Sequence, residues 1–361
     1  MPVILGVAKV KKLYDEPDDK RKLHKQPVPS LGGVGMFVGF IISILLTVNF
    51  TAEAPEFQYY IAAFLLIFFV GIKDDILVTS ATKKLLGQLA AAGILVFKAE
   101  LIITNMDGLL GFHELNTAFS YLLTIFSIVV IINAFNLIDG VDGLAGSIGL
   151  ISALVFGVYF LINHDISYAV LAFSFAGSLV AFLMFNFHPA KIFMGDTGSL
   201  IVGLVNSILV IKFIQTAGTY SNYPISAAPA VGFGILLLPL MDTLRVFSIR
   251  IKNGRSPFSP DRNHIHHLLL NRGFSHKSVT IICVLTTILI SAFTFLFQQL
   301  GTGLLIACEI ALFFAIIFLL NYKKAKYNLR VVKGDGKGIV PEDKVKLVSL
   351  FDKKGAVVEE E

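Results

Sequence analysis

Ten long apolar runs determine what this chain can fold into. They lie at residues 31–50, 57–72, 83–97, 118–135, 144–162, 167–186, 199–217, 226–241, 278–298 and 302–321. A transmembrane helix takes about 20 apolar residues. Only 15% of the 361 residues are charged, whereas an average soluble domain has about 25%. The pattern predicts an all-α, polytopic integral membrane protein with about ten transmembrane helices.

Lysine and arginine are sorted between the two sides that these runs define. One side takes residues 9–30, 73–84, 136–143, 187–198, 242–277 and the tail from 322, and it holds 28 of the 30 basic residues. The exceptions are Lys98, on the other side, and Lys212, within a run. Because cytoplasmic loops are enriched in Lys and Arg, the first side is predicted to be cytoplasmic. Topology thereby explains the net charge of +5, and no nucleic-acid partner is expected.

The two ends of the chain differ from the apolar runs. Residues 1–10 are apolar but too short to span a bilayer, so we expect a short N-terminal stub, the end of a helix. Residues 1–321 are predicted to form one membrane-embedded domain. Residues 322–361 are predicted to be a polar cytoplasmic tail whose lysine-rich start lies against anionic headgroups.

One short stretch at the cytoplasmic boundary, residues 193–199 (FMGDTGS), combines two glycines with a carboxylate. Gly195 and Gly198 allow a tight turn and close approach to a ligand. Asp196 supplies a hard oxygen ligand, the kind that Mg²⁺ takes when phosphates complete its shell. The alternative is an ordinary helix N-terminal cap.

A pair of acids, Asp74 and Asp75, closes the second apolar run. Acids at a helix C-terminus oppose the helix dipole, and adjacent carboxylates repel each other. A cation or a function is expected to compensate. The alternative is a solvated pair balanced by Lys73, Lys83 and Lys84.

Two more acids, Asp139 and Asp142, lie in a loop without positive charge, NLIDGVDG at 136–143. Because they are three residues apart, they share a face if the loop is helical. Uncompensated acids at a membrane boundary indicate a ligand or a metal. The alternative is that Asp142 caps the next helix.

Basic and aromatic residues accompany these acids. Lys191 is suited to pair with phosphate or with lipid headgroups, and Phe193 to stack on a planar base or to pack in the core. The longest cytoplasmic loop carries His264, His266 and His267. Three histidines are suited to a transition metal, but no Cys or nearby Glu completes a zinc site, and the arginines favour an anionic ligand. The alternative is a surface loop without function.

Four motifs together resemble a known family. They are DD at 74–75, NLIDGVDGLA at 136–145, NFHPAKIFMGDTGS at 186–199 and SPFSPDRNHIHHLLLNRGF at 256–274. Their order on one membrane face is similar to that of the bacterial polyprenyl-phosphate N-acetylhexosamine-1-phosphate transferases, glycosyltransferase family 4, over about residues 15–321. The HIHH loop is closer to the N-acetylglucosamine branch than to the muramoyl branch. The family has eleven spans, of which residues 1–10 match only the end of the first.

The resemblance implies roles for residues at matching positions. Asp196 is the implied Mg²⁺ ligand, with Mn²⁺ as a substitute. The candidate catalytic residues are Asp74, Asp75, Asp139, Asp142, His264, His266 and His267. The candidate substrate-binding residues are Lys25, Ser30, Asn136, Leu137, Asn186, Lys191, Phe193 and Arg262. Among these, Leu137, Asp142, Asn186 and Phe193 match nucleoside-binding positions, and the histidines with Arg262 match a loop that closes over the sugar and diphosphate.

The implied reaction transfers a sugar-1-phosphate, N-acetylglucosamine-1-phosphate being favoured, from a UDP-sugar to undecaprenyl phosphate and releases UMP. The family also implies the bacterial inner membrane, a cytoplasmic active site and a homodimer. Another UDP-N-acetylhexosamine remains an alternative donor. An ion-coupled transporter is disfavoured because the motif acids gather on one face, the centres of the spans are expected to lack carboxylates and no repeat is visible, whereas transporter sites lie near the midplane, often between repeats. A lipid-binding scaffold without activity also stays open.

Overall fold

The structure is a computed structural model. It describes residues 28–50, 54–77, 79–220, 222–256 and 263–322, with short pieces at 1–2, 4–6, 14–15, 330–331 and 347–348.

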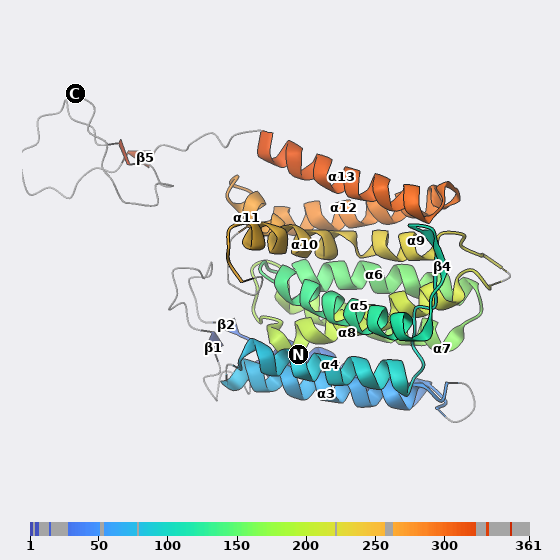
Figure 1. The fold of residues 1–361 in the computed structure, drawn as a ribbon. Helices are drawn as coiled ribbons and strands as arrows, with labels where there is room; N and C mark the ends of the chain where they lie inside the picture. Colours follow the sequence, from blue (N-terminus) through green and yellow to red (C-terminus); the bar gives the residue numbers. More distant parts are fainter. Residues whose placement is uncertain are drawn as a thin grey trace, which may run out of the picture.

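The described chain is a bundle of helices that run side by side along one direction (Figure 1). Nine of the predicted apolar runs match single helices: α2 (Gly32–Thr47), α3 (Phe57–Leu77), α4 (Ala81–Phe97), α5 (Thr117–Ile138), α6 (Leu144–Ile162), α7 (Ile166–Asn186), α8 (Gly195–Thr216), α12 (His276–Leu296) and α13 (Thr302–Tyr322). The run at 226–241 covers α9 (Ala228–Ile235) and only the start of α10 (Leu237–Lys252), which continues into the predicted loop 242–277. The short α11 (Ile265–Leu270) and a 3₁₀ turn, η1 (Gln298–Leu300), flank α12. The prediction of an all-α polytopic membrane protein is confirmed.

The predicted number of ten spans is not confirmed. Within the described ranges, six helices are long and apolar enough to cross a membrane, and α9 with α10 makes a seventh if that bent pair is one span. The two halves of the pair meet at 79°. Pro239, in the first turn of α10, has no N–H to continue the ladder of α9. Three helices are not among these candidate spans. Helices α2 and α4 have 16 and 17 residues, and α3 carries Lys73 and the acidic pair at its end.

Helix α8 is the centre of the bundle. Its residues from Thr197 to Ile211 are all buried, and α2, α3, α5 and α6 pack around it. A helix surrounded on every side needs apolar or small residues all round. Glycine permits the closest of these contacts, because a Cβ at Gly33 of α2 would overlap the backbone of Gly198, and one at Gly71 of α3 would lie 2.5 Å from Thr197 Cα.

Short strand pairs lie in the connections. A hairpin of β3 (Asn105–Leu109) and β4 (Phe112–Glu114) covers one end of the bundle, in the predicted loop 98–117 (Figure 1). At the opposite end, β1 (Tyr14–Asp15) pairs with β2 (Val28–Pro29). A further two-residue pair, β5 (Arg330–Val331) with β6 (Leu347–Val348), is what the structure describes of the predicted tail.

The two ends of the bundle are chemically different. We call one the carboxylate end, because Asp74, Asp75, Asp139, Asp142 and Asp196 all lie there, and the other the hairpin end, after β3 and β4. Hydrogen bonds link segments that are more than 100 residues apart in sequence. One example is the bond that Asp75 accepts from Thr197, the neighbour of Asp196. The expectation that the motifs meet on one face is therefore met.

We expect Gly33→Ala to lower the free energy of unfolding by about 3 kcal/mol, because the new methyl group would press on the backbone of α8 rather than on a flexible side chain. Thermal denaturation in detergent measures this. Gly39→Ala on the same helix is the matched control, since a Cβ there meets nothing within 4 Å. Equal stability of the two variants would contradict the prediction.

Candidate active site

The loop before α8 is fixed by backbone hydrogen bonds to α2. The first N–H groups of a helix have no partner within it. Those of Gly32 and Gly33 donate to the carbonyl oxygens of Phe193 and Met194, both at 2.9 Å, and Phe193 N–H donates to Pro29 O at 2.7 Å. Gly195 then adopts a positive φ of 69°, with the Ser30 carbonyl and Asp75 where a Cβ would point. The turn that carries Asp196 is thus built mainly from backbone contacts.

Asp75 caps α8 from a neighbouring helix. Its Oδ1 accepts the Asp196 N–H at 2.7 Å, and its Oδ2 accepts the N–H and hydroxyl of Thr197 at 3.0 and 2.5 Å. A carboxylate at a helix N-terminus satisfies orphan donors and complements the dipole. Both oxygens of Asp75 are occupied in this way, which makes it a residue that positions Asp196.

Asp74 faces a different partner, the ammonium group of Lys84. Oδ1 of Asp74 accepts from the N–H and hydroxyl of Thr79 at 2.6 and 2.5 Å. Its Oδ2 lies 2.5 Å from Lys84 Nζ, which also pairs with Asp196 Oδ2. The Asp196 and Lys84 side chains are 25% and 24% exposed, so solvent and ligands can reach them. Two carboxylates therefore converge on one cation.

Asn136, at the end of α5, holds the other oxygen of Asp196. Its Nδ2 donates to Asp196 Oδ1 at 3.2 Å and to Ser199 Oγ at 2.9 Å. The predicted binding residue Asn136 and the predicted metal ligand Asp196 are thus in direct contact.

Asp139 and Asp142 do not share a face, because α5 ends at Ile138 and the loop between them is not helical. Asp139 lies toward Asp196 and Asp75. Its burial, with the negative charges of Asp196, Asp75 and Asp142, raises its pKa to about 7. Asp142 does not cap α6 either, since Gly143 is the capping residue.

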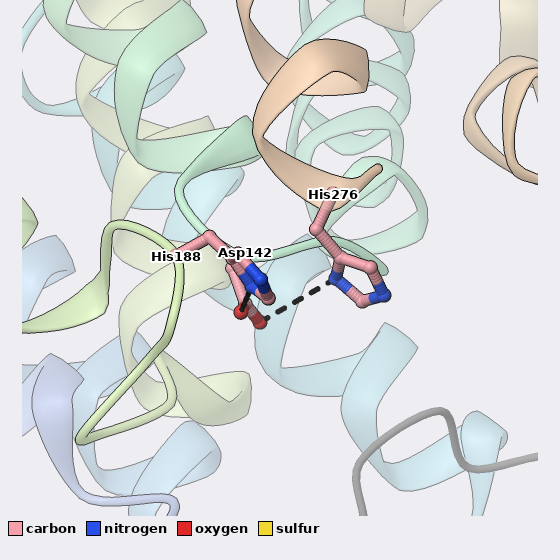
Figure 2. Close-up of side chains that lie close together, drawn as sticks. All are labelled: Asp142, His188 and His276. Carbon is pink, nitrogen blue, oxygen red and sulfur yellow. Dashed lines mark hydrogen bonds and ion pairs between the residues drawn. The ribbon is translucent and has the colours of Figure 1, made fainter. Parts of the chain in front are cut away.

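Asp142 instead finds histidines from other segments. Its Oδ2 accepts from His188 Nδ1 at 2.7 Å and from Ala190 N–H at 3.2 Å, and His276 lies on its other side (Figure 2). Burial by itself raises the pKa of Asp142, but the imidazoles of His276 and His188 and the Ala190 N–H outweigh it, so the pKa lies below its usual range. The loop lacks positive charge in sequence, yet the fold supplies compensating groups.

The remaining predicted binding residues lie in different environments, and Ser30 meets Gly195 through its backbone carbonyl. Asn186 is buried, and its amide ties Gly143 N–H to Ile192 O, both at 2.8 Å. Phe193 is held by its backbone, as described above. Lys191 is exposed, and Leu137 lines a cavity. Lys25 and Arg262 lie outside the described residues.

The histidine loop is anchored by Asp242 of α10. Asp242 Oδ2 accepts from His264 Nδ1 at 2.8 Å, and its Oδ1 accepts from Ile265 N–H at 2.9 Å and from Arg245 at 2.8 Å. His264 is therefore committed to a buried ion pair or hydrogen bond inside the loop.

His266 meets the loop of Asp139. Its ring stacks on that of His264, with centroids 5.6 Å apart, and its Nε2 lies against Gly140. Burial lowers the pKa of His266 to about 3, and neighbouring His267 adds to the effect. His266 is therefore neutral near pH 7, and His267, half-buried beside it, completes the set.

Sequence reasoning missed three residues of this site, Lys84, Asp242 and His276, the last of which gave no signal apart from its position at the start of an apolar run. The sequence presents Lys84 only as a balancing charge for the acidic pair, and its position ten residues after Asp74 is the available signal. Asp242 gave little signal, since it is a single acid at the end of an apolar run whose partner lies 22 residues further on.

A cavity of about 430 Å³ opens beside the Lys84 and Asp196 pair, between α4, α5 and α10. Its polar lining includes Lys84, Gln88, Asn133, Asn136 and Arg250. Further along the same α5–α10 seam, a second cavity of about 350 Å³ is lined almost wholly by apolar side chains, among them Phe126, Val130, Leu240 and Leu244. The polar cavity, here called the polar mouth, and the apolar cavity thus lie along the same two helices, α5 and α10.

These features define a multi-pass membrane protein with a cluster of carboxylates and basic groups at one end of its bundle. A family model described as glycosyl transferase family 4 matches residues 57–214. The chain is 35% identical over 290 residues to the decaprenyl-phosphate N-acetylglucosaminephosphotransferase of Mycolicibacterium smegmatis, covering 74% of this chain and 71% of the relative. It is 30% identical over 291 residues to the undecaprenyl-phosphate alpha-N-acetylglucosaminyl 1-phosphate transferase of Escherichia coli K12, covering 79% and 77%. The chain belongs to glycosyl transferase family 4.

We expect Asp139→Asn to change how stability depends on pH. The folded chain holds a proton on Asp139 up to about pH 7, whereas the unfolded carboxyl loses it near its ordinary value of 3.8. Stability therefore falls as pH rises between these values. The asparagine variant lacks this loss, so the difference in stability between variant and wild type should grow by about 4 kcal/mol from low pH to above pH 7, since one pKa unit is about 1.4 kcal/mol.

Thermal denaturation from about pH 5 to about pH 9, with a chelator present, measures this difference. Glu114→Gln, at an exposed position of the hairpin end, serves as the control. Parallel curves for wild type and Asp139→Asn would contradict the prediction.

Proposed function

We propose that the chain transfers N-acetylglucosamine-1-phosphate from UDP-N-acetylglucosamine to undecaprenyl phosphate, releasing UMP, at the cytoplasmic face of the bacterial inner membrane. The observation that carries the proposal is the convergence of Asp74, Asp196 and Lys84 at the mouth of the α5–α10 seam. The names of two relatives, which contain a polyprenyl phosphate and N-acetylglucosamine, support the substrates.

The orientation rests on charge. The segments at the carboxylate end belong to the side that holds 28 of the 30 lysines and arginines, which favours the cytoplasm. A nucleotide sugar made in the cytoplasm would then reach the site from water, and the lipid phosphate would reach it from the inner leaflet.

The lipid substrate fits the two cavities along α5 and α10. Its phosphate would lie in the polar mouth, near Lys84 and Arg250, and its isoprenoid chain would follow the apolar channel lined by Phe126, Val130 and Leu244. Apolar burial of the chain would contribute most of the lipid affinity.

The chemistry is a displacement at phosphorus. An oxygen of the lipid phosphate would attack the sugar-bearing phosphorus of the diphosphate, and the bond from that phosphorus to the oxygen of UMP would break. A phosphate dianion needs no base to attack, so the protein would act by positioning and charge. Asp75 would position Asp196 by capping α8, and Lys84 would offer its ammonium group to the phosphates.

The donor set fits a divalent cation of the Mg²⁺ type. Asp74 and Asp196 present carboxylate oxygens to one positive charge, the Lys84 ammonium, and Asn136 orients Asp196. Hard oxygen ligands of this kind suit Mg²⁺ or Mn²⁺. When bound, the cation would neutralise charge on the diphosphate. Asp196 would hold it, with Asp74 beside it.

A transporter is less well supported. The motif acids gather at the carboxylate end, away from the middle of the bundle. Glu309 is the exception to the expected absence of acids within spans, since it is buried in α13 beside Gly234 and Thr294. It lies on a different helix from all members of the carboxylate cluster, and no hydrogen-bond partner of its carboxylate is found among the described residues.

Release of UMP by the purified protein tests the reaction. With Mg²⁺, undecaprenyl phosphate and a panel of UDP-N-acetylhexosamines, we expect release that requires the lipid and is fastest with UDP-N-acetylglucosamine. Asp196→Asn should lower kcat by about 100-fold or more, a loss typical of removing a group that stabilises transition-state charge, while Glu114→Gln should leave it unchanged. A folded protein that releases no UMP from any donor would contradict the proposal.

The lipid path has its own test. Ser127 of α5 lines the apolar cavity, whereas Leu122 of the same helix is 66% exposed. Ser127→Phe should fill the channel and raise KM for undecaprenyl phosphate about tenfold, equivalent to about 1.4 kcal/mol. A lipid phosphate with two isoprene units should be unaffected, and Leu122→Phe should leave both KM values unchanged. An equal rise for both lipids would place the tail elsewhere.

A further inference from the structure

A polar cavity lies at the hairpin end, at the other end of the bundle from the carboxylate cluster. It has a volume of about 610 Å³ and is formed where α3 and α7 begin and where α4 and α8 end. Both basic residues that the sequence places away from the cytoplasmic loops, Lys98 and Lys212, line this cavity. Glu56 and Glu100 line it as well. The cavity thus gathers two ammonium groups and two carboxylates at a membrane boundary.

The charged groups of this cavity are held apart from one another. Lys212 Nζ lies over the Tyr168 ring, 4.4 Å from its centroid. The hydroxyl at the edge of that ring donates to Glu56 Oε1 at 2.9 Å. In the described ranges, neither the Lys212 nor the Lys98 ammonium group has an ion-pair or hydrogen-bond partner. Tyr168 therefore separates a positive from a negative charge that face the same cavity, and both ammonium groups stay available to a ligand.

Buried side chains and backbone groups fix the walls of the cavity. Tyr168 and Tyr60 are 3% and 1% exposed, and their hydroxyl oxygens are 2.7 Å apart. Because Tyr168 donates its proton to Glu56, Tyr60 is the donor in this pair. The Gln215 amide donates to the Glu100 carbonyl at 3.0 Å and ties the end of α8 to the segment after α4. The cavity is therefore formed before any ligand binds, and its charges need little rearrangement.

An exposed stripe leads away from the cavity along α3. Gln58 lines the cavity, and Ala62, Leu65 and Phe69 follow it at helical spacing on the same face. All four are exposed, Leu65 at 40% and Phe69 at 62%. In a bundle set in a bilayer, an apolar face of this kind contacts the acyl chains of lipids. The polar cavity and the apolar stripe thus suit the headgroup and the tail of one membrane lipid.

We propose that this cavity binds the headgroup of a phospholipid in which a phosphate is joined to a primary ammonium group, as in phosphatidylethanolamine. The phosphate would accept from the ammonium groups of Lys98 and Lys212, and the lipid ammonium would donate to the carboxylates of Glu56 and Glu100. Two charges of each sign favour a zwitterionic headgroup, because the glutamates repel one with an excess of negative charge. Tyr59 adds an aromatic ring at the cavity wall, typical of a membrane interface. The proposal does not depend on the transferase activity.

The chain contains no tryptophan, which allows a direct test by fluorescence. Tyr59→Trp places one fluorophore at the cavity wall. Phe297→Trp is the control, since Phe297 is 46% exposed at the same end of the bundle but follows α12, on the side opposite α3 (Figure 1). Each full-length variant is reconstituted in bilayers with lipids whose brominated acyl chains quench tryptophan. We expect phosphatidylethanolamine to quench Tyr59→Trp at about fivefold lower mole fraction than phosphatidylglycerol or phosphatidylcholine, and Phe297→Trp without preference.

Charge variants in the Tyr59→Trp background test the roles of single side chains. Lys212→Gln should abolish the preference for phosphatidylethanolamine, and Lys212→Arg, which keeps the charge, should retain it. Glu56→Gln can still accept from Tyr168, but it should shift the preference toward phosphatidylglycerol, because one repelling carboxylate is gone. Lys252→Gln is the matched control, since Lys252 is exposed at the end of α10, at the carboxylate end.

The comparison of headgroups needs no charge variant, so it decides the question even if one of these variants does not fold. Glycerophosphoethanolamine, which has the headgroup but no acyl chains, distinguishes a lipid from a free anion, and we expect it not to displace the brominated lipid. Equal quenching of Tyr59→Trp by the three lipids would overturn the proposal. A preference that survives Lys212→Gln, or displacement by the soluble headgroup, would overturn it as well.

Discussion

The carboxylate of Asp75 at the N-terminus of α8 is the interaction on which the site depends. In its own helix, Asp75 lies at the C-terminal end, where it opposes the dipole. In the fold it accepts three hydrogen bonds from Asp196 and Thr197 and complements the dipole of α8 instead. The charge that is unfavourable for one helix thus stabilises the next, and it fixes the direction of the Asp196 side chain in the first turn.

Close backbone approach makes that cap possible. Gly71 lies one turn before Asp75 on α3, so both residues are on the same face of the helix. A side chain at Gly71 would meet the backbone of Thr197, and it would hold α3 too far away for Asp75 to reach the first N–H groups of α8. Gly33 has the same function on α2. The packing of the helices and the geometry of the candidate site are therefore set by the same small residues.

The sequence predicted the helices well but predicted the partners of its acids poorly. Hydropathy located all the long helices because apolar length is a local property, although it did not separate spanning helices from short or charged ones such as α4. The motifs identified most of the residues that meet at the carboxylate end. What sequence could not reveal were long-range partners: Lys84 between two carboxylates, Asp242 beneath His264, and His276 beside Asp142. Asp74 and Asp75, adjacent in sequence, differ because consecutive residues point about 100° apart on a helix.

Six carboxylates at one end of a membrane protein require compensation, and the fold supplies it in several ways. Backbone N–H groups and a hydroxyl stabilise the Asp75 carboxylate, and one ammonium serves both Asp74 and Asp196. Histidines serve Asp142 and Asp242, together with a backbone N–H at Asp142 and an arginine at Asp242. Asp139 has no comparable partner in the described part of the chain, and its raised pKa means that it keeps a proton up to about pH 7 instead. Asp74 and Asp196 differ from the other four acids because they share one flexible, partly exposed side chain, that of Lys84. An incoming cation can therefore replace the Lys84 ammonium between these two carboxylates, and an incoming phosphate can take the ammonium as its partner. The reaction that we propose is centred on this group of three residues.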